Sequence, residues 1–136
     1  MIRRTAGWAV AAFLICTGIV LAHDVAYPTS AVLAFQPATG SHPDRFRGVV
    51  SSSNEKCVPA RKVKLYHFAH KGTPDPSQDV LVGSDTTNAD GRYVIVPDEA
   101  VGPPNYYAKV TKSDRSDRPG HDHICSATFS NTAAAA

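Results

Sequence analysis

Apolar and polar residues alternate along most of the chain after residue 22, and no segment there has the 3.6-residue period of an amphipathic helix. Short runs rich in β-branched and aromatic residues are separated by Gly, Pro, Asn and Asp, which is the pattern of an all-β protein. We therefore expect six or seven short strands that form a β-sandwich or barrel over residues 46–130. The pattern predicts strands at residues 46–51, 62–68, 80–82, 93–96, 106–111 and 124–129.

The two ends of this domain have weaker patterns. Residues 23–45 form an N-terminal extension in which Ala31 to Ala34 are apolar, and the segment is either an edge strand or an ordered tail. Residues 131–136 end in four alanines, and we expect a disordered tail. Between the ends, Asp90-Gly91 predicts a hairpin between two strands, because the tight turn needs positive φ.

The first 22 residues have the pattern of a secretory signal peptide. Arg3 and Arg4 supply the positive start, residues 9–21 are mostly apolar, and residues 20–22 present small or apolar side chains to a signal peptidase. A membrane-spanning helix needs about 20 continuous apolar residues, and this run is shorter. We expect cleavage after Ala22 and a secreted, extracellular or cell-envelope protein with no membrane span. An uncleaved N-terminal anchor is the alternative.

The charge balance excludes a strongly basic protein. The chain has 14 Lys and Arg against 12 Asp and Glu, and Arg3 and Arg4 leave with the signal peptide, so residues 23–136 are formally neutral. A nucleic-acid partner would need a clustered basic excess. The basic residues between Arg45 and Lys64 are spread out and are typical of a solvated face. We expect an extracellular protein or polysaccharide as the partner, and no nucleic acid.

Two of the three cysteines remain after export. Cys16 lies in the apolar run and leaves with the signal peptide. Cys57 and Cys125 are an isolated pair in an oxidising compartment, which predicts a disulfide. On the chain-entropy account, closing so long a loop stabilises the fold by roughly 4 kcal/mol. The bond would join the region after the first core strand to the last strand.

Five segments of the chain form a recognisable series: Phe46–Val50, Cys57–Pro59, Val63–Tyr66, Gly83–Tyr93 and Tyr106–Val110. Together they resemble the transthyretin-like and carboxypeptidase regulatory-like domains, which open on a G-x-V strand and carry a T-x-T-d-x-d-G-x-y hairpin. The resemblance covers residues 46 to about 129. It implies a seven-stranded Greek-key β-sandwich of the prealbumin-like or immunoglobulin-like kind, which serves as an accessory or adhesive module. One enzyme of the wider group, hydroxyisourate hydrolase, ends in Tyr-Arg-Gly-Ser, whereas this chain ends in alanines.

The segment Arg118–His123 is the strongest candidate for metal chemistry. His121 and His123 are two residues apart, so in extended backbone both imidazoles would project to one side. The R-P-x-H-x-H pattern is similar to that of intradiol dioxygenases, which are built on a related sandwich. That resemblance implies ferric iron held by His121, His123 and two tyrosines, one of them Tyr106 or Tyr107. The second tyrosine would lie between Tyr66 and Tyr93, where the chain has none.

A second metal hypothesis starts from cleavage after Ala22. His23 would become the N-terminus, with its amine and imidazole free to chelate, as in small periplasmic copper carriers. Imidazole suits copper, zinc and iron alike. The alternative interpretation is a solvated loop, because Ser, Asp, Pro and Gly surround His121 and His123.

These observations favour a secreted, non-enzymatic β-sandwich that acts in binding, adhesion or envelope structure and has no cofactor. The alternative is a metal-binding or intradiol-dioxygenase-like sandwich that uses His121 and His123 with iron or copper. The stretches around the serines lack a nucleophile elbow, and no glycine-rich phosphate loop is present.

Overall fold

The computed structural model describes residues 23–117 and 119–135, so the predicted signal peptide lies outside the described residues. The described part is built of strands, with one short 3-10 helix at Glu55–Cys57. The strands are β1 (His23–Tyr27), β2 (Thr29–Gln36), β3 (Arg45–Ser52), β4 (Lys62–His67), β5 (Val80–Thr86), β6 (Arg92–Ile95), β7 (Asn105–Val110), β8 (Ser113–Asp114), β9 (His121–Cys125), β10 (Thr128–Phe129) and β11 (Ala133–Ala134).

The expected all-β fold is confirmed, but its strands are more numerous than the sequence predicted. The region in which we expected seven strands contains eight among the described residues, β3 to β10, and β1, β2 and β11 lie outside it. β8, β10 and β11 have only two residues each. The predicted last strand at 124–129 is two strands, because the chain leaves β9 at Cys125 and pairs again with β7 only at Thr128. No helix of the described residues is long and apolar enough to cross a membrane.

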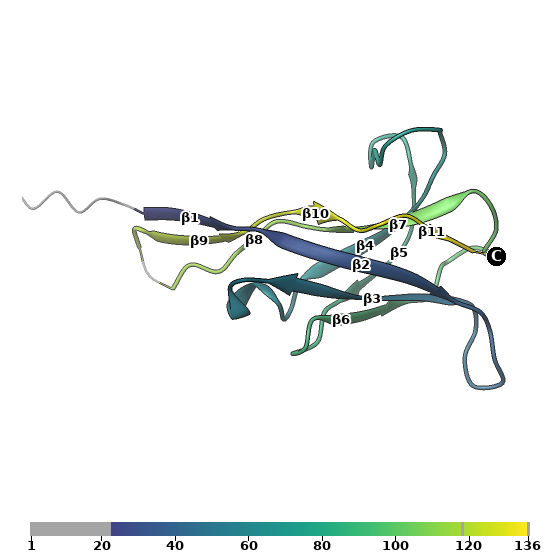
Figure 1. Ribbon diagram of the computed structural model, residues 1–136, viewed down its shortest axis with the longest axis horizontal. Helices are drawn as coiled ribbons and strands as arrows, with labels where there is room; N and C mark the ends of the chain where they lie inside the picture. Colours follow the sequence, from purple (N-terminus) through teal and green to yellow (C-terminus); the bar gives the residue numbers. More distant parts are fainter. Residues whose placement is uncertain (1–22, 118, 136) are drawn as a thin grey trace, which may run out of the picture.

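Three sheets build the molecule (Figure 1). One has the strand order β10-β7-β4-β5, with β11 also paired to β7, and the second has the order β2-β3-β6. These two sheets lie face to face, as in a β-sandwich. The third sheet, β1-β9-β8, extends from one end, and its β1 and β9 run parallel.

The core lies between the first two sheets because apolar residues alternate along both. Phe46 and Val50 of β3 and Val63 and Leu65 of β4 are almost completely buried and belong to one cluster. Their neighbours in sequence therefore point away from the core. The remaining buried members of the cluster are Leu33, Val82, Tyr93, Ile95, Tyr106, Ala108, Val110 and Ala133.

The N-terminal extension, for which strand and tail were both open, contains strands. β2 pairs along its whole length with β3, from Thr29 opposite Ser52 to Gln36 opposite Arg45, and it contributes Leu33 to the core. By pairing with β3, the β2 segment both forms ladder hydrogen bonds and buries its apolar side chains, which together stabilise it as a strand.

The expectation of a disordered C-terminal tail is wrong for the described residues 131–135. Ala133 pairs with Tyr106 of β7 and is 8% exposed. The Asn131 side chain accepts the Leu33 N–H at 2.8 Å and donates to the Leu33 carbonyl at 2.9 Å. The Asn131 side chain thus forms the hydrogen bonds that a neighbouring strand would form at the outer edge of β2. It also links β2 to the sheet that contains β10 and β7.

The Asp90-Gly91 turn exists, but it does not close a hairpin within one sheet. Gly91 has φ +79°, as expected, yet β5 and β6 belong to different sheets. Gly91 accepts the Val50 N–H, and the Asp85 carboxylate accepts the Val94 N–H at 2.8 Å. The first contact holds the turn against β3, and the second joins β6 to β5 of the other sheet, so the turn connects the two layers.

A disulfide and a buried arginine join the layers at one end. The Cys57–Cys125 disulfide is present and both residues are fully buried. Arg61, also fully buried, donates to the carbonyls of Cys57, Thr111 and Ser126 and to the hydroxyl of Thr29. Burial, and then the nearby Arg115, lower the pKa of Arg61. The guanidinium therefore links four parts of the chain: the start of β2, the 3-10 helix, and the residues that follow β7 and β9.

We predict that Arg61→Ala lowers the free energy of unfolding by about 4 kcal/mol, because four oxygens lose a donor and a cavity remains. Urea denaturation followed by circular dichroism measures this. Arg61→Lys is the matched variant and should recover only part of the loss, because one ammonium cannot reach all four oxygens. A change below 1 kcal/mol for Arg61→Ala would contradict the assigned role.

Candidate functional site

The outer face of the sheet β2-β3-β6 gathers arginines. Because Phe46 and Val50 point into the core, Arg45 and Arg47 point outward from β3. Arg92 of β6 is opposite Val49 and faces the same way. We call this surface the arginine face and define it by Arg45, Arg47 and Arg92 together with Val32, Ala34, Val49 and Val94.

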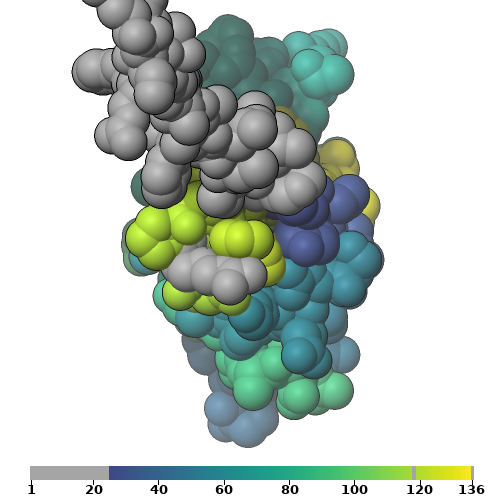
Figure 2. Space-filling view, turned by 90° about the vertical axis from the view of Figure 1, so that its left-hand side faces the viewer, coloured from purple at the N-terminus to yellow at the C-terminus, as the bar shows by residue number. Residues whose placement is uncertain are grey.

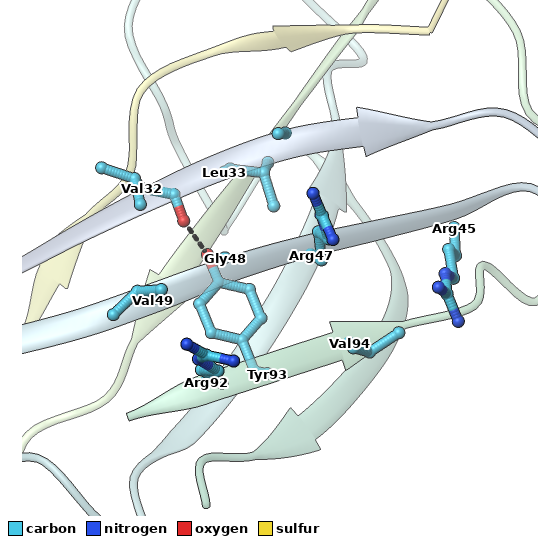
Figure 3. A pocket seen from close by; sticks show the side chains of 10 residues that line it. Val32, Leu33, Arg45, Arg47, Gly48, Val49, Arg92, Tyr93 and Val94 are labelled. Atoms are coloured by element: carbon cyan, nitrogen blue, oxygen red, sulfur yellow. Dashed lines mark hydrogen bonds between the residues drawn. The ribbon is translucent and has the colours of Figure 1, made fainter. Parts of the chain in front are cut away.

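This face carries an open hollow of about 540 Å³ (Figure 3). The valines separate the arginines and are well exposed, Val32 by 58% and Val94 by 43%. Val32 is opposite Val49, and Arg47 lies between Ala34 and Val94, so cationic and apolar positions alternate across the three strands. The hollow is lined by Val32, Leu33, Ala34, Arg45, Arg47, Gly48, Val49, Arg92, Tyr93 and Val94.

A glycine and a tyrosine make the floor of the hollow. The Tyr93 ring passes under Gly48, and its hydroxyl donates to the Val32 carbonyl at 2.6 Å (Figure 3). A Cβ at Gly48 would lie 1.8 Å from that carbonyl oxygen and 2.3 Å from the Tyr93 hydroxyl, so only glycine fits. Burial raises the pKa of Tyr93, which keeps this hydrogen bond neutral. The contact ties all three strands beneath the arginines.

The arginine face has no neutralising carboxylate. None of the residues that line the hollow is acidic, and among the described residues Arg45, Arg47 and Arg92 make no ion pair. Arg45 donates its Nε to the Gln36 side chain at 2.7 Å. Guanidinium groups present planar donors that suit carboxylate, sulfate or phosphate. The face can therefore hold an anionic partner.

His121 and His123 lie in a strand, so the alternative that placed them in a solvated loop is wrong for them. The parallel ladder places residue 23 opposite His121 and Val25 opposite His123. Figure 2 shows this end of the molecule, with β1 beside β9. The His123 ring packs edge-on against Tyr27 at 5.8 Å, and its buried Nδ1 has no hydrogen-bond partner among the described residues.

The tyrosines proposed as iron ligands are used elsewhere. Tyr106 is buried, stacks on His67 at 4.4 Å, and accepts the Gly102 N–H. Tyr107 is buried and donates to the Asp79 carboxylate at 2.7 Å. Both lie on β7, far from the β1-β9 ribbon in Figure 1. The structure thus does not bring Tyr106 or Tyr107 to His121 and His123.

Metal-ligating side chains do not cluster elsewhere in the part of the chain that the structure describes. No group there of three or more His, Cys, Asp or Glu is placed to hold an ion. Neither Tyr106 nor Tyr107 can complete an iron site with His121 and His123. The ladder position of residue 23 beside His121 is the observation that favours a metal site of another kind.

A buried carboxylate organises the loop between β4 and β5. Asp79 accepts the backbone N–H groups of Ala69 and Asp75, the Tyr107 hydroxyl and the His70 Nδ1, all at 2.7 to 2.9 Å. Burial opposes its ionisation, but these donors outweigh burial and lower the pKa of Asp79 to about 2. Burial and the Asp79 contact raise the pKa of Tyr107. The network fixes the loop over the outer face of β4 and β7.

Sequence reasoning missed the arginine face and the Asp79 network. The signal for the face was present: R-F-R at 45–47 and R-Y-V at 92–94 alternate around core aromatics. It was not recognised because only the structure places β6 beside β3. The Asp79 network joins a loop to β7 over a long sequence distance and leaves no local pattern.

Comparisons of this chain with family models, with curated proteins and with solved structures found no match. The interpretation of the arginine face therefore rests on its geometry and charge.

We predict that stability falls between pH 4 and pH 2 because Asp79 becomes protonated. Its pKa is about 2 in the folded chain and about 3.9 in an unfolded one, so its contribution is present above pH 4 and disappears as pH falls through 2. Asp79→Asn should be less stable at pH 7, and its difference in Tm from the original protein should narrow on acidification. A difference that stays constant from pH 6 to pH 2 would contradict this assignment.

Proposed function

We propose that this chain is a secreted, non-enzymatic β-sandwich module that binds an acidic polysaccharide outside the cell through the arginine face. The observation that carries the proposal is the set of three arginines without a carboxylate on one rigid sheet face. The signal-peptide pattern of residues 1–22 and the disulfide both support export.

The chemistry of the face favours a polyuronate or similar polymer over other anions. Arg45 and Arg47 are two residues apart on one strand, so their attachment points lie about 7 Å apart, and Arg92 is diagonal to Arg47. A linear polymer with a carboxylate on successive sugars offers repeated partners for such a row. The exposed valines offer apolar contact to the C–H faces of the sugar rings.

The same proposal includes the fold family, the strand topology and the cleavage site. We place the chain with the transthyretin-like and carboxypeptidase regulatory-like sandwiches, with a Greek-key arrangement of the long strands and cleavage after Ala22. The packing of β2-β3-β6 against β4, β5 and β7 supports this placement. It agrees with a role as an accessory or adhesive module, although fold alone does not define function.

We predict that the Arg47→Ala/Arg92→Ala double variant binds sodium polygalacturonate about tenfold more weakly than the original protein. Each exposed charge pair contributes on the order of 0.2–1 kcal/mol, and tenfold corresponds to about 1.4 kcal/mol. Isothermal titration calorimetry at low ionic strength measures the affinity, and added salt should weaken it.

The matched control is Lys71→Ala/Lys112→Ala, which removes the same charge from exposed positions outside the arginine face. This control should bind polygalacturonate as the original protein does. The proposal would be overturned if the arginine variant bound polygalacturonate as tightly as the original protein does. It would also be overturned if the original protein bound uncharged dextran, or bound a single-stranded DNA of similar charge more tightly than polygalacturonate. Tm values of both variants verify that they are folded.

A second candidate function is metal binding at the β1-β9 end. The supporting observation is the ladder, which sets residue 23 opposite His121, with His123 two residues further along β9. Cleavage after Ala22 would leave the α-amine of His23 at that position, so amine and imidazole nitrogens would gather there. Such a nitrogen set suits copper best in the Irving–Williams order, and zinc next.

We predict about one Cu(II) per exported chain under this second hypothesis, lost in the His121→Ala/His123→Ala variant. Titration followed by electron paramagnetic resonance would show nitrogen ligation. His42→Ala/His70→Ala is the control, because it removes two histidines outside the ribbon. Unchanged copper binding in the His121→Ala/His123→Ala variant would contradict the site.

A further inference from the structure

A second basic face lies on the opposite side of the sandwich. Val63 and Leu65 of β4 and Val110 of β7 point into the core, so Lys62, Lys64 and Lys109 point outward from that sheet. We call this surface the lysine face and define it by these three lysines. None of the three forms an ion pair among the described residues.

Two lysines of this face lie close enough to repel each other. Lys64 of β4 is directly opposite Lys109 of β7 in the ladder, and like charges in such cross-strand pairs destabilise a sheet. The other ladder neighbours of these two residues are Ser84 and Phe129, neither of which neutralises charge. Phe129 is 41% exposed and offers a flat apolar surface next to Lys109. An anionic partner on this face would relieve the repulsion.

The two basic faces cannot be covered by one straight polymer strand. Their inward neighbours, such as Phe46 and Val63, belong to one core cluster, so the faces point in opposite directions. Packed sheets are about 10 Å apart, and the side chains on each outer surface add to that separation. A single strand would have to bend around an edge of the sandwich to reach both.

From this geometry we propose that the protein is bivalent and bridges two strands of acidic polysaccharide, one on the arginine face and one on the lysine face. This proposal rests on the proposed function, since it assigns the same class of ligand to a second site. Bridging converts weak single contacts into strong attachment, because once one site is filled the other meets a high local concentration of polymer.

The test compares the original protein with Arg47→Ala/Arg92→Ala, Lys64→Ala/Lys109→Ala and the control Lys71→Ala/Lys112→Ala. Calorimetry with a short oligogalacturonate gives the number of sites, and light scattering with long polygalacturonate gives bridging. The original protein and the control should bind two oligomers per chain and raise scattering with a maximum at an intermediate protein-to-polymer ratio. Each face variant should bind one oligomer and raise no scattering above that of the polymer alone.

The outcomes separate the two proposals. One oligomer per chain in the original protein, lost in the arginine variant only, would overturn bridging and leave the proposed function intact. Two oligomers and full scattering in the Lys64→Ala/Lys109→Ala variant would also overturn the lysine face as the second site. No binding by any of the four proteins would overturn both proposals. Scattering by the original protein without polymer would show self-association and would overturn bridging as its cause.

Discussion

The buried guanidinium of Arg61 is the interaction on which the arrangement of the molecule depends. It replaces its lost water with oxygens of Cys57, Thr29, Thr111 and Ser126, which belong to the disulfide region, the start of β2 and the ends of β7 and β9. A buried charge without a carboxylate is stable only when such oxygens surround it. The planar fork of arginine suits this task, because its donors point in fixed, divergent directions. The sheets, the disulfide and the β1-β9 ribbon meet around this one side chain.

The distribution of carboxylates explains why both sheet faces keep free cations. Five of the twelve acidic residues accept backbone N–H groups: Asp44, Asp75, Asp79, Asp85 and Asp114. Asp44, Asp75 and Asp79 lie in loops, and Asp85 and Asp114 lie in β5 and β8, whereas Arg and Lys occupy several outward positions of β3, β4, β6 and β7. Residues 23–136 are formally neutral, yet their cations gather on two sheet faces that lack these carboxylates. Net charge alone conceals this division.

Local patterns predicted the strands well and the long-range contacts poorly. The alternation around Phe46, Val63 and Ala108 identified β3, β4 and β7 within one or two residues, because each has one buried face. The Cys57–Cys125 bond was predictable from compartment and number alone. The pairing of β1 with β9 was not, since Pro, Gly and Asp around His121 resemble a loop and only a partner strand makes the segment extended. For the same reason the arginine face was read as scattered charge: strand order determines which residues share a surface.

The contact between Asn131 and Leu33 has a consequence for how the molecule is made. Asn131 stands almost at the end of the chain, and its side chain completes the edge of a strand formed by some of the first residues of the described domain. During synthesis this edge of β2 stays open while the 98 residues that separate Leu33 from Asn131 are added. An open edge offers unpaired N–H and C=O groups to any neighbouring strand. Once Asn131 is in place, its side chain occupies both backbone groups of Leu33, so a strand of another molecule cannot pair with them.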